Sequence, residues 1–259
     1  MNDPVLPAGS LAGRRALITG SSRGIGADTA TYLAAAGAKV AINFRNKEVR
    51  ALKVADAIRE AGGEAITVGG DLTDPASVAA MFDTIRSEWG GLDLLVLNAS
   101  GGMEGGMAED YAMKLNRDAQ VGVLDAALPL MASGSRIVFV TSHQAHFIDE
   151  VPTLPEYVQV AKSKRAGEDA LRARIPELAE KGIEFVVVSG DMIEGTITAT
   201  LLERVRPGAI DSRREAAGKL YSVSEFAGEV AQAAVDPIPE ENLRLVGDVS
   251  YFTEYGSHR

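Results

Sequence analysis

Cysteine is absent from the 259 residues of this sequence. A chain without thiols forms no disulfide, no thiolate metal centre and no cysteine nucleophile. Apolar runs of about 18 residues are missing as well, so no membrane-spanning segment is predicted. Residues 1–10 contain no basic stretch followed by an apolar one, which argues against a secretory signal. We therefore expect a soluble, cytoplasmic protein.

Basic residues are scarce relative to acidic ones. The chain has 26 Lys and Arg against 36 Asp and Glu, a formal net charge of −10. Nucleic-acid binding depends on clustered Lys and Arg that neutralise phosphates, so this balance argues against nucleic acid as a main partner. We expect a small molecule as the ligand, with no membrane partner and no bound metal.

Short apolar runs that are typical of buried strands alternate with longer segments that are typical of helices. The expected strands are 14–19, 39–44, 65–68, 92–97, 135–141, 183–188 and 243–246. The expected helices are 27–36, 47–61, 75–89, 108–132, 157–179, 196–206 and 222–234. This alternation predicts one α/β domain over residues 1–259, with a Rossmann-like, doubly wound and predominantly parallel sheet that carries helices on both faces. In such sheets the ligand binds beyond the carboxyl ends of the strands, so functional residues should follow strands.

The first strand leads directly into a glycine-rich turn. Gly20, Gly24 and Gly26 follow the apolar run within seven positions, and an alanine-rich helix comes next. Backbone N–H groups at a helix N-terminus are unpaired and lie at the positive end of the helix dipole. Glycines let that backbone approach a pyrophosphate closely. The stretch therefore predicts a dinucleotide site, with Ser22 and Ile25 in the same loop.

The spacing Thr19-Gly20-x3-Gly24-Ile25-Gly26 resembles the short-chain dehydrogenase/reductase family, and the resemblance extends over residues 12–247. The resemblance implies a nicotinamide cofactor, hydride transfer to or from a small carbonyl or alcohol substrate, and a catalytic group of Ser, Tyr and Lys. It also implies a homodimer or homotetramer. Val121, Leu124, Leu128 and Met131 have the spacing of a second buried helix face, although one face against the sheet explains this spacing equally well.

Two arginines flank the expected adenosine ribose. An acidic residue after the second strand would select NAD by accepting from the ribose 2′-OH, but this chain has Arg45 there and no acid before Glu48. Arg23 lies in the glycine loop. A guanidinium offers planar paired donors that suit a 2′-phosphate, and the resemblance also implies NADP(H). The alternative is that both arginines are solvated surface charges.

The resemblance assigns further cofactor contacts. Asp71 and Leu72 follow the third strand and match the family's adenine-binding acid, with a loop-forming Asp as the alternative. Asn98, Ser100 and Gly101 follow the fourth strand and match the segment that supports the adenine ribose, although the family's first Asn is a leucine here.

The resemblance also gives a substrate lid at residues 191–220. After the sixth strand the family usually has Pro-Gly, and Gly190 keeps the glycine. Thr196 is expected near the nicotinamide carboxamide. Four lid arginines could contact an anionic substrate, or simply form a solvated helix face: Arg204, Arg206, Arg213 and Arg214.

The catalytic group matches the family at two of its three positions. Ser142 after the fifth strand matches the serine, and Lys164 matches the lysine, which also binds the nicotinamide ribose. The tyrosine should lie four residues before the lysine, where this chain has Val160. Tyr157 lies seven residues before Lys164, about 10 Å along a helix axis, but its interval from Ser142 is close to the family's. Asn116 matches the helix Asn of the proton relay, with a solvent-facing Asn as the alternative.

Other proton donors lie between Ser142 and Tyr157: His143, His146, Asp149 and Glu150. A histidine titrates near neutral pH and would serve as a donor. The commoner role of such residues is an ordinary one in a loop. The sequence therefore predicts an NADP(H)-dependent oxidoreductase that reduces a ketone to an alcohol. The alternative, suggested by Val160, is a catalytically degenerate NADP(H)-binding sensor or regulatory protein.

Overall fold

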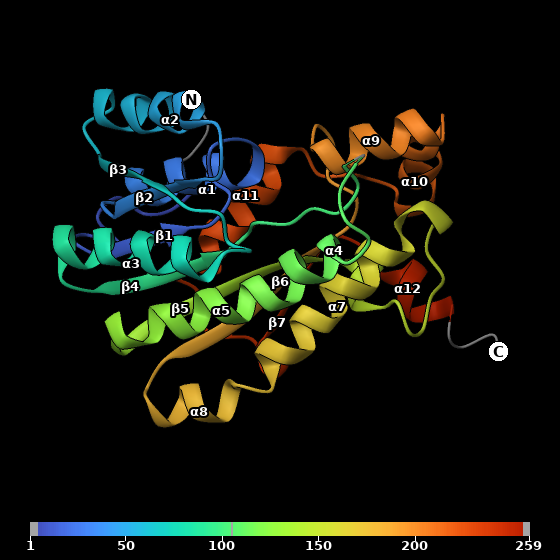
Figure 1. Cartoon of the computed structure of the whole chain (residues 1–259). Coiled ribbons are helices and arrows are strands. Elements are labelled where there is room, and N and C mark those ends of the chain that lie inside the picture. The colour runs from blue at the N-terminus through green and yellow to red at the C-terminus, as the bar shows by residue number, and fades with distance from the viewer. Residues whose placement is uncertain (1–4, 105, 256–259) are drawn as a thin grey trace.

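The computed structural model describes residues 5–104 and 106–255, which form a seven-stranded parallel sheet between two layers of helices (Figure 1). The strands are β1 (Arg15–Ile18), β2 (Lys39–Phe44), β3 (Glu64–Gly69), β4 (Leu92–Leu97), β5 (Met131–Ser142), β6 (Glu184–Gly190) and β7 (Leu243–Val246). Their order is β3-β2-β1-β4-β5-β6-β7. The chain reverses its winding direction between β1 and β4, which creates a crevice at their carboxyl ends. The predicted fold class is confirmed, although the predicted domain of 1–259 includes residues 1–4, 105 and 256–259, which lie outside the described ranges.

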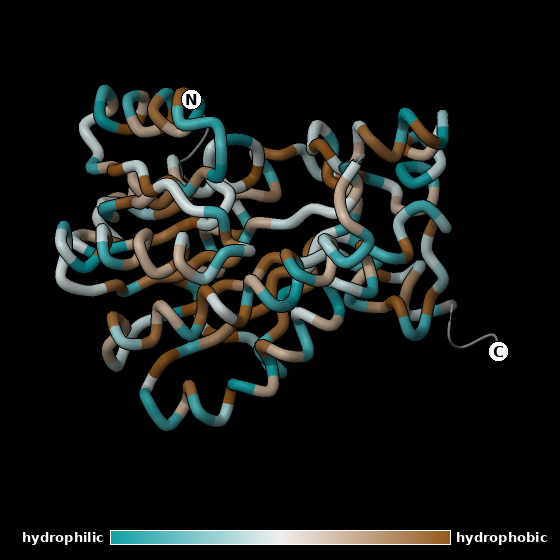
Figure 2. Tube along the Cα trace, in the orientation of Figure 1, coloured by the Kyte–Doolittle hydropathy of each residue, from teal (hydrophilic) through white to brown (hydrophobic). Residues whose placement is uncertain are grey.

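Strands buried on both faces explain why the sequence shows continuous apolar runs rather than alternation. Successive side chains of a strand point to opposite faces. In β1, Ala16 and Ile18 pack into one apolar cluster and Leu17 packs into the other. Figure 2 shows the hydrophobic residues gathered along the strands.

Helices cover both faces of the sheet (Figure 1). One layer contains α1 (Gly24–Ala35), α2 (Glu48–Glu60) and α11 (Val223–Gln232), and the other contains α3 (Pro75–Trp89), α5 (Ala119–Ala127), α7 (Val158–Arg172) and α8 (Ile175–Glu180). The ends of α3 agree with the sequence, since the Asp74 carboxylate accepts from the Ala76 N–H and Gly90 adopts a left-handed φ of 70°. In the described ranges, no helix is long and apolar enough to cross a membrane.

The expected helix over 108–132 is wrong in detail. It comprises α4 (Tyr111–Met113), a π turn over Lys114–Asp118, α5, and a 3₁₀ turn over Leu128–Leu130, after which β5 begins at Met131. Pro129 lacks the N–H that would continue the helix. The expected helix over 157–179 also divides, into α7 and α8, where Pro176 lies in the first turn of α8. Between the expected strand 135–141 and the expected helix 157–179, where the sequence predicts neither element, the structure has a short helix, α6 (His143–His146).

Half of the expected assembly face is internal. Leu124 is fully buried and Met131, which lies in β5, is 8% exposed, so both contribute to the core of the single chain. Val121 and Leu128 are only partly buried. Two-fold pairing through this side of the molecule would cover these two residues. A homodimer or homotetramer therefore stays a prediction. Light scattering at micromolar concentration tests it, and a monomer would contradict it.

Three helices lie beside the carboxyl edge of the sheet. These are α9 (Ile197–Val205), α10 (Ala209–Ala217) and α12 (Ser250–Tyr255). Figure 1 shows α9 and α10 on the side to which the strands point, where the sequence predicts a lid. The expected helix over 196–206 corresponds to α9, whose N-terminus is capped by the Thr196 hydroxyl. Residues of α10 were expected in the lid but not as a separate helix.

Candidate active site

One cavity of 1320 Å³ extends along the carboxyl edge of the sheet. The glycine loop, the segments that follow β2 to β6, and residues of α9, α10 and α12 line it. Much of the lining thus follows strands, as the sheet topology predicts for a ligand site. In the ranges that the structure describes, no cluster of three or more His, Asp or Glu has a metal-binding arrangement.

The glycine loop forms a cradle that excludes side chains. Gly20 has a φ of +64°, and a Cβ there would lie 3.0 Å from the Cα of Ala99. A Cβ on Gly26 would lie 2.7 Å from Nδ2 of Asn98. Residues 22–26 line the cavity at the N-terminus of the twelve-residue α1. The cradle therefore fits a pyrophosphate, which accepts hydrogen bonds from such N–H groups.

Polar side chains at the ends of β1, β2 and β4 hold this loop in place. The Thr19 hydroxyl accepts from the backbone N–H groups of Asn98 and Ala99 at 2.9 and 3.0 Å. Oδ1 of Asn43 accepts from the N–H of Gly20 at 3.0 Å. Asn43 is 2% exposed, and our sequence interpretation missed it. The available signal was an amide near the carboxyl end of a largely apolar strand.

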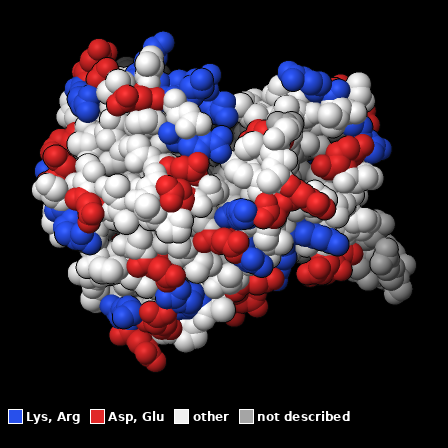
Figure 3. All heavy atoms as spheres, in the orientation of Figure 1, with Lys and Arg blue, Asp and Glu red and all other residues white. Residues whose placement is uncertain are grey.

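Four cations line the cavity beside the glycine loop and the start of α2: Arg23, Arg45, Lys47 and Arg50. Among the described residues, none of the four has a carboxylate within salt-bridge distance. Figure 3 shows Lys and Arg side chains gathered where α2 begins. In a chain of net charge −10, four unpaired cations in one place favour an anionic ligand group.

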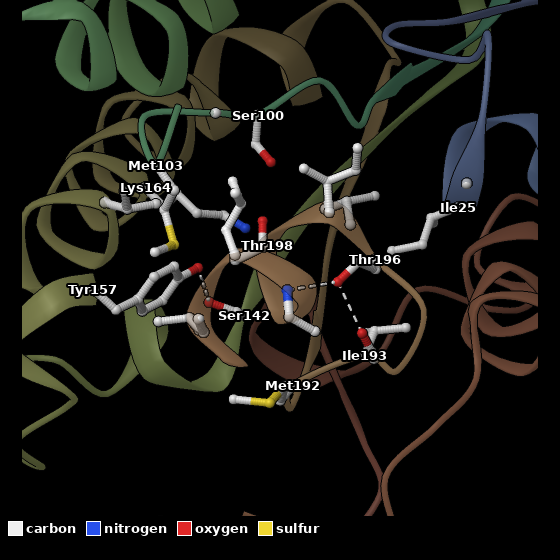
Figure 4. Close-up of a pocket in the computed structure, with 18 of the residues that line it drawn as sticks. Ile25, Ser100, Met103, Ser142, Tyr157, Lys164, Met192, Ile193, Thr196 and Thr198 are labelled. Carbon is white, nitrogen blue, oxygen red and sulfur yellow. Dashed lines mark hydrogen bonds between the residues drawn. The ribbon is translucent and has the colours of Figure 1, made fainter. Parts of the chain in front are cut away.

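The predicted adenine residues lie beside these cations. Asp71 and Leu72 line the cavity, but Oδ1 of Asp71 also accepts from the N–H of Thr73 at 2.9 Å, so the carboxylate shapes its own loop as well. Asn98, Ser100 and Gly101 line the cavity on the other side. Figure 4 shows the Ser100 hydroxyl directed into it.

Of the two cofactor residues expected after the sixth strand, Thr196 lines the cavity and Gly190 does not. A Cβ on Gly190 would lie 2.3 Å from the ring of Phe226, so Gly190 packs behind Phe226 and is not part of the described cavity lining. Thr196 does line the cavity, and its hydroxyl donates to the carbonyl of Ile193 at 2.8 Å. The neighbouring Thr198, which the sequence interpretation missed, points toward the centre of the cavity (Figure 4).

The structure brings Ser142 and Tyr157 together. Their hydroxyl oxygens lie 3.4 Å apart at the cavity wall, and the two residues are 8% and 6% exposed (Figure 4). Tyr157 ends a 3₁₀ turn just before α7. It lies three residues before Val160, and both side chains line the cavity and pack in one apolar cluster. The side chain of Lys164 reaches into the same cavity from the second turn of α7 (Figure 4).

Asn116 lies behind this group rather than in solvent. It is 1% exposed, and its Nδ2 donates to the carbonyl of Gly101 at 2.8 Å and to the hydroxyl of Ser163 at 2.9 Å. A Cβ on Gly167 would lie 2.0 Å from the Asn116 carbonyl oxygen, so α7 packs closely against the π turn. These contacts join the loop after β4 to the helix that carries Lys164. The solvent-facing alternative is wrong.

The other proposed proton donors lie outside the described cavity lining. His143 is fully buried and contacts the Ser189 hydroxyl at 2.8 Å and the Val246 carbonyl at 3.2 Å. Nδ1 of His146 contacts Glu168 at 2.8 Å. Asp149 and Glu150 are exposed. Of the five candidates, only Tyr157 lines the cavity.

The burial of His143 predicts a pH-dependent stability. Burial lowers its pKa from the ordinary 6.5 to about 4. The folded state therefore disfavours the proton, so this contribution is complete above pH 6.5 and is lost as the pH falls toward 4, a difference of about 3 kcal/mol. We expect His143→Gln to reduce by this amount the loss of unfolding free energy between pH 7 and pH 4, measured by urea denaturation. An unchanged pH dependence would contradict this expectation.

Three of the four arginines in the segment expected to form a lid lie within salt-bridge distance of a carboxylate. Arg213 of α10 makes a bidentate ion pair with Asp191 after β6, at 2.6 Å, and both side chains are largely buried. The Arg213 guanidinium also lies 4.5 Å from the ring centroid of Tyr251 and 4.6 Å from that of Phe252. Arg214 pairs with Glu194, and Arg206 lies 3.8 Å from Glu156. Arg213 therefore connects α10 to the segment after β6 and to α12, and its paired charge is largely neutralised.

Comparison with known proteins assigns the family. The family model described as short chain dehydrogenase matches residues 14–206. The chain belongs to the short-chain dehydrogenase family. A probable tetrahydroxynaphthalene reductase of Zymoseptoria tritici is 31% identical over 192 residues, which are 72% of this chain and 70% of that relative.

Solved structures of the family share the fold. A short-chain dehydrogenase of Burkholderia cenocepacia J2315, in complex with NADP, is 28% identical with a TM-score of 0.76, and the match covers 92% of this chain and 98% of that one. The angucycline C-6 ketoreductase LanV, with bound NADP, is 28% identical with a TM-score of 0.73 and coverages of 88% and 91%. The resemblance of the glycine motif to this family is thereby confirmed.

Proposed function

We propose that this short-chain dehydrogenase is an NADP(H)-dependent ketoreductase in which Tyr157 supplies the proton. The observation that carries the proposal is the pair of Ser142 and Tyr157 hydroxyls, 3.4 Å apart in the cavity that contains the glycine cradle. LanV, a relative with this fold, is a ketoreductase solved with NADP.

Each residue of the site has a separate role in the proposed carbonyl reduction. The nicotinamide, when bound, supplies the hydride. The Ser142 hydroxyl donates a hydrogen bond that holds the substrate oxygen, and the Tyr157 hydroxyl transfers its proton to that oxygen. The Lys164 ammonium stabilises the phenolate that remains. Asn116 and Ser163 hold α7 and the loop after β4 in register, so that these groups stay aligned.

NADPH oxidation followed at 340 nm against ketones, aldehydes and 3-ketoacyl thioesters tests the proposed activity. We expect turnover with at least one ketone. NADPH binding without turnover of any panel member would contradict the ketoreductase assignment.

The unpaired cations predict the choice of cofactor. We expect NADPH to bind at least about tenfold more tightly than NADH, a difference of ~1.4 kcal/mol. Arg45→Asp should reduce or reverse this preference, because a carboxylate repels a 2′-phosphate and accepts from a 2′-OH. Fluorescence titration with both cofactors measures it, with Arg86→Asp on the outer part of α3 as the control. Equal affinities of the parent protein for the two cofactors would contradict the assignment.

A further inference from the structure

Tyr111 has no part in the chemistry proposed above, yet its hydroxyl contacts a cofactor residue. Nη1 of Arg45 donates to Oη of Tyr111 at 2.5 Å, and the Arg45 guanidinium carbon lies 5.8 Å from the centroid of the tyrosine ring. The two residues are 66 positions apart in the chain. Both line the cavity.

The contact crosses the cofactor crevice. Arg45 follows β2, whereas Tyr111 begins α4, in the connection that follows β4. In the sheet, β1 lies between β2 and β4. The bond therefore joins segments that follow strands on opposite sides of β1, whose carboxyl end leads into the glycine cradle.

The hydrogen-bond roles leave both groups able to serve an anion. Tyr111 accepts from Arg45, so its own hydroxyl proton is not used in this bond. Among the described residues, the Tyr111 hydroxyl is the one hydrogen-bond partner that the structure gives to Arg45, and a guanidinium has five N–H donors. Arg45 is otherwise exposed, and without a partner its long side chain would sample many rotamers.

We propose that Tyr111 is a positioning residue for cofactor selection: its hydroxyl holds the Arg45 guanidinium over the crevice, ready for the 2′-phosphate of NADP(H). Fixing the guanidinium before binding reduces the entropy that is lost when the phosphate is bound. The proposal depends on the NADP(H) preference proposed above.

Isothermal titration with two fragments tests this role without any substrate. The fragments 2′,5′-ADP and 5′-AMP differ only in the 2′-phosphate. We expect Tyr111→Phe, which keeps the ring and removes the hydroxyl, to weaken 2′,5′-ADP binding about tenfold and to leave 5′-AMP binding within about twofold of the parent protein. In an Arg45→Met background, Tyr111→Phe should cause no further loss, because the residue acts through Arg45.

Three results would overturn the proposal: an equal loss for both fragments, no loss for either, or additive losses in the double variant. Tyr32→Phe, on the far part of α1, is the matched control, and thermal melting verifies that each variant is folded. If the parent protein itself binds the two fragments equally, the NADP(H) preference fails. If only the Tyr111→Phe result fails, that preference stands.

Discussion

Tyr157→Phe is expected to lower turnover roughly 10²–10⁴-fold, the usual contribution of a general acid, while NADPH affinity changes little. Only the hydroxyl is lost, and it faces Ser142 and the substrate side of the cavity rather than the glycine loop. The phenyl ring still fills the apolar cluster that Tyr157 forms with Val160 and Leu202, so the fold should be retained. Steady-state NADPH oxidation with the fastest ketone of the panel measures the effect.

Tyr221→Phe is the control for this prediction, because Tyr221 contacts Lys219 and is not part of the described cavity lining. Its turnover should equal that of the parent protein. Full activity of Tyr157→Phe would assign the proton to another group, such as a water held near Ser142. Loss of NADPH affinity together with turnover would instead indicate that Tyr157 shapes the cofactor site.

The fold could be predicted from the sequence because its signals are local. Apolar runs such as Leu92–Leu97 are buried on both faces, and the cap at Asp74 and the glycine at Gly90 set the ends of α3 by short-range contacts. The glycine cradle could be predicted for the same reason, since its spacing is fixed by one turn. The prediction failed where contacts with residues distant in the chain determine the local backbone conformation. An example is the expected long helix, which the π turn around Asn116 interrupts.

The arrangement of the candidate catalytic group was only partly predictable. Position counting on a regular helix places Tyr157 about 10 Å from Lys164 along the axis, and only the packed structure shows that its hydroxyl lies 3.4 Å from that of Ser142. The sequence interpretation assigned no role to Asn43 or Tyr111, because their hydrogen-bond partners, Gly20 and Arg45, are distant in the chain. Neither residue lies in a motif, and only the packed structure shows the contacts.

Lys164→Met is expected to reduce both turnover and cofactor affinity, which distinguishes it from Tyr157→Phe. The family resemblance gives its ammonium two partners, the tyrosine and the nicotinamide ribose. Methionine retains the apolar stem but removes every donor and the positive charge. We expect turnover to fall roughly 10²-fold or more, because the phenolate left after proton transfer loses its nearby cation. NADPH binding should weaken by about 1.5–3 kcal/mol, the usual value of a charge-assisted hydrogen bond.

Lys162→Met is the matched control for Lys164→Met. Lys162 lies on the same helix two residues earlier, is exposed and is not part of the described cavity lining. Two residues on an α-helix differ by about 200° in direction, so Lys162 points away from the site. Its replacement should change neither turnover nor the fluorescence titration with NADPH. Equal effects of the two substitutions would show that general surface charge, rather than an ammonium in the cavity, produces the loss. An effect of Lys164→Met on turnover alone would leave its role beside Tyr157 intact and remove the contact with the nicotinamide ribose.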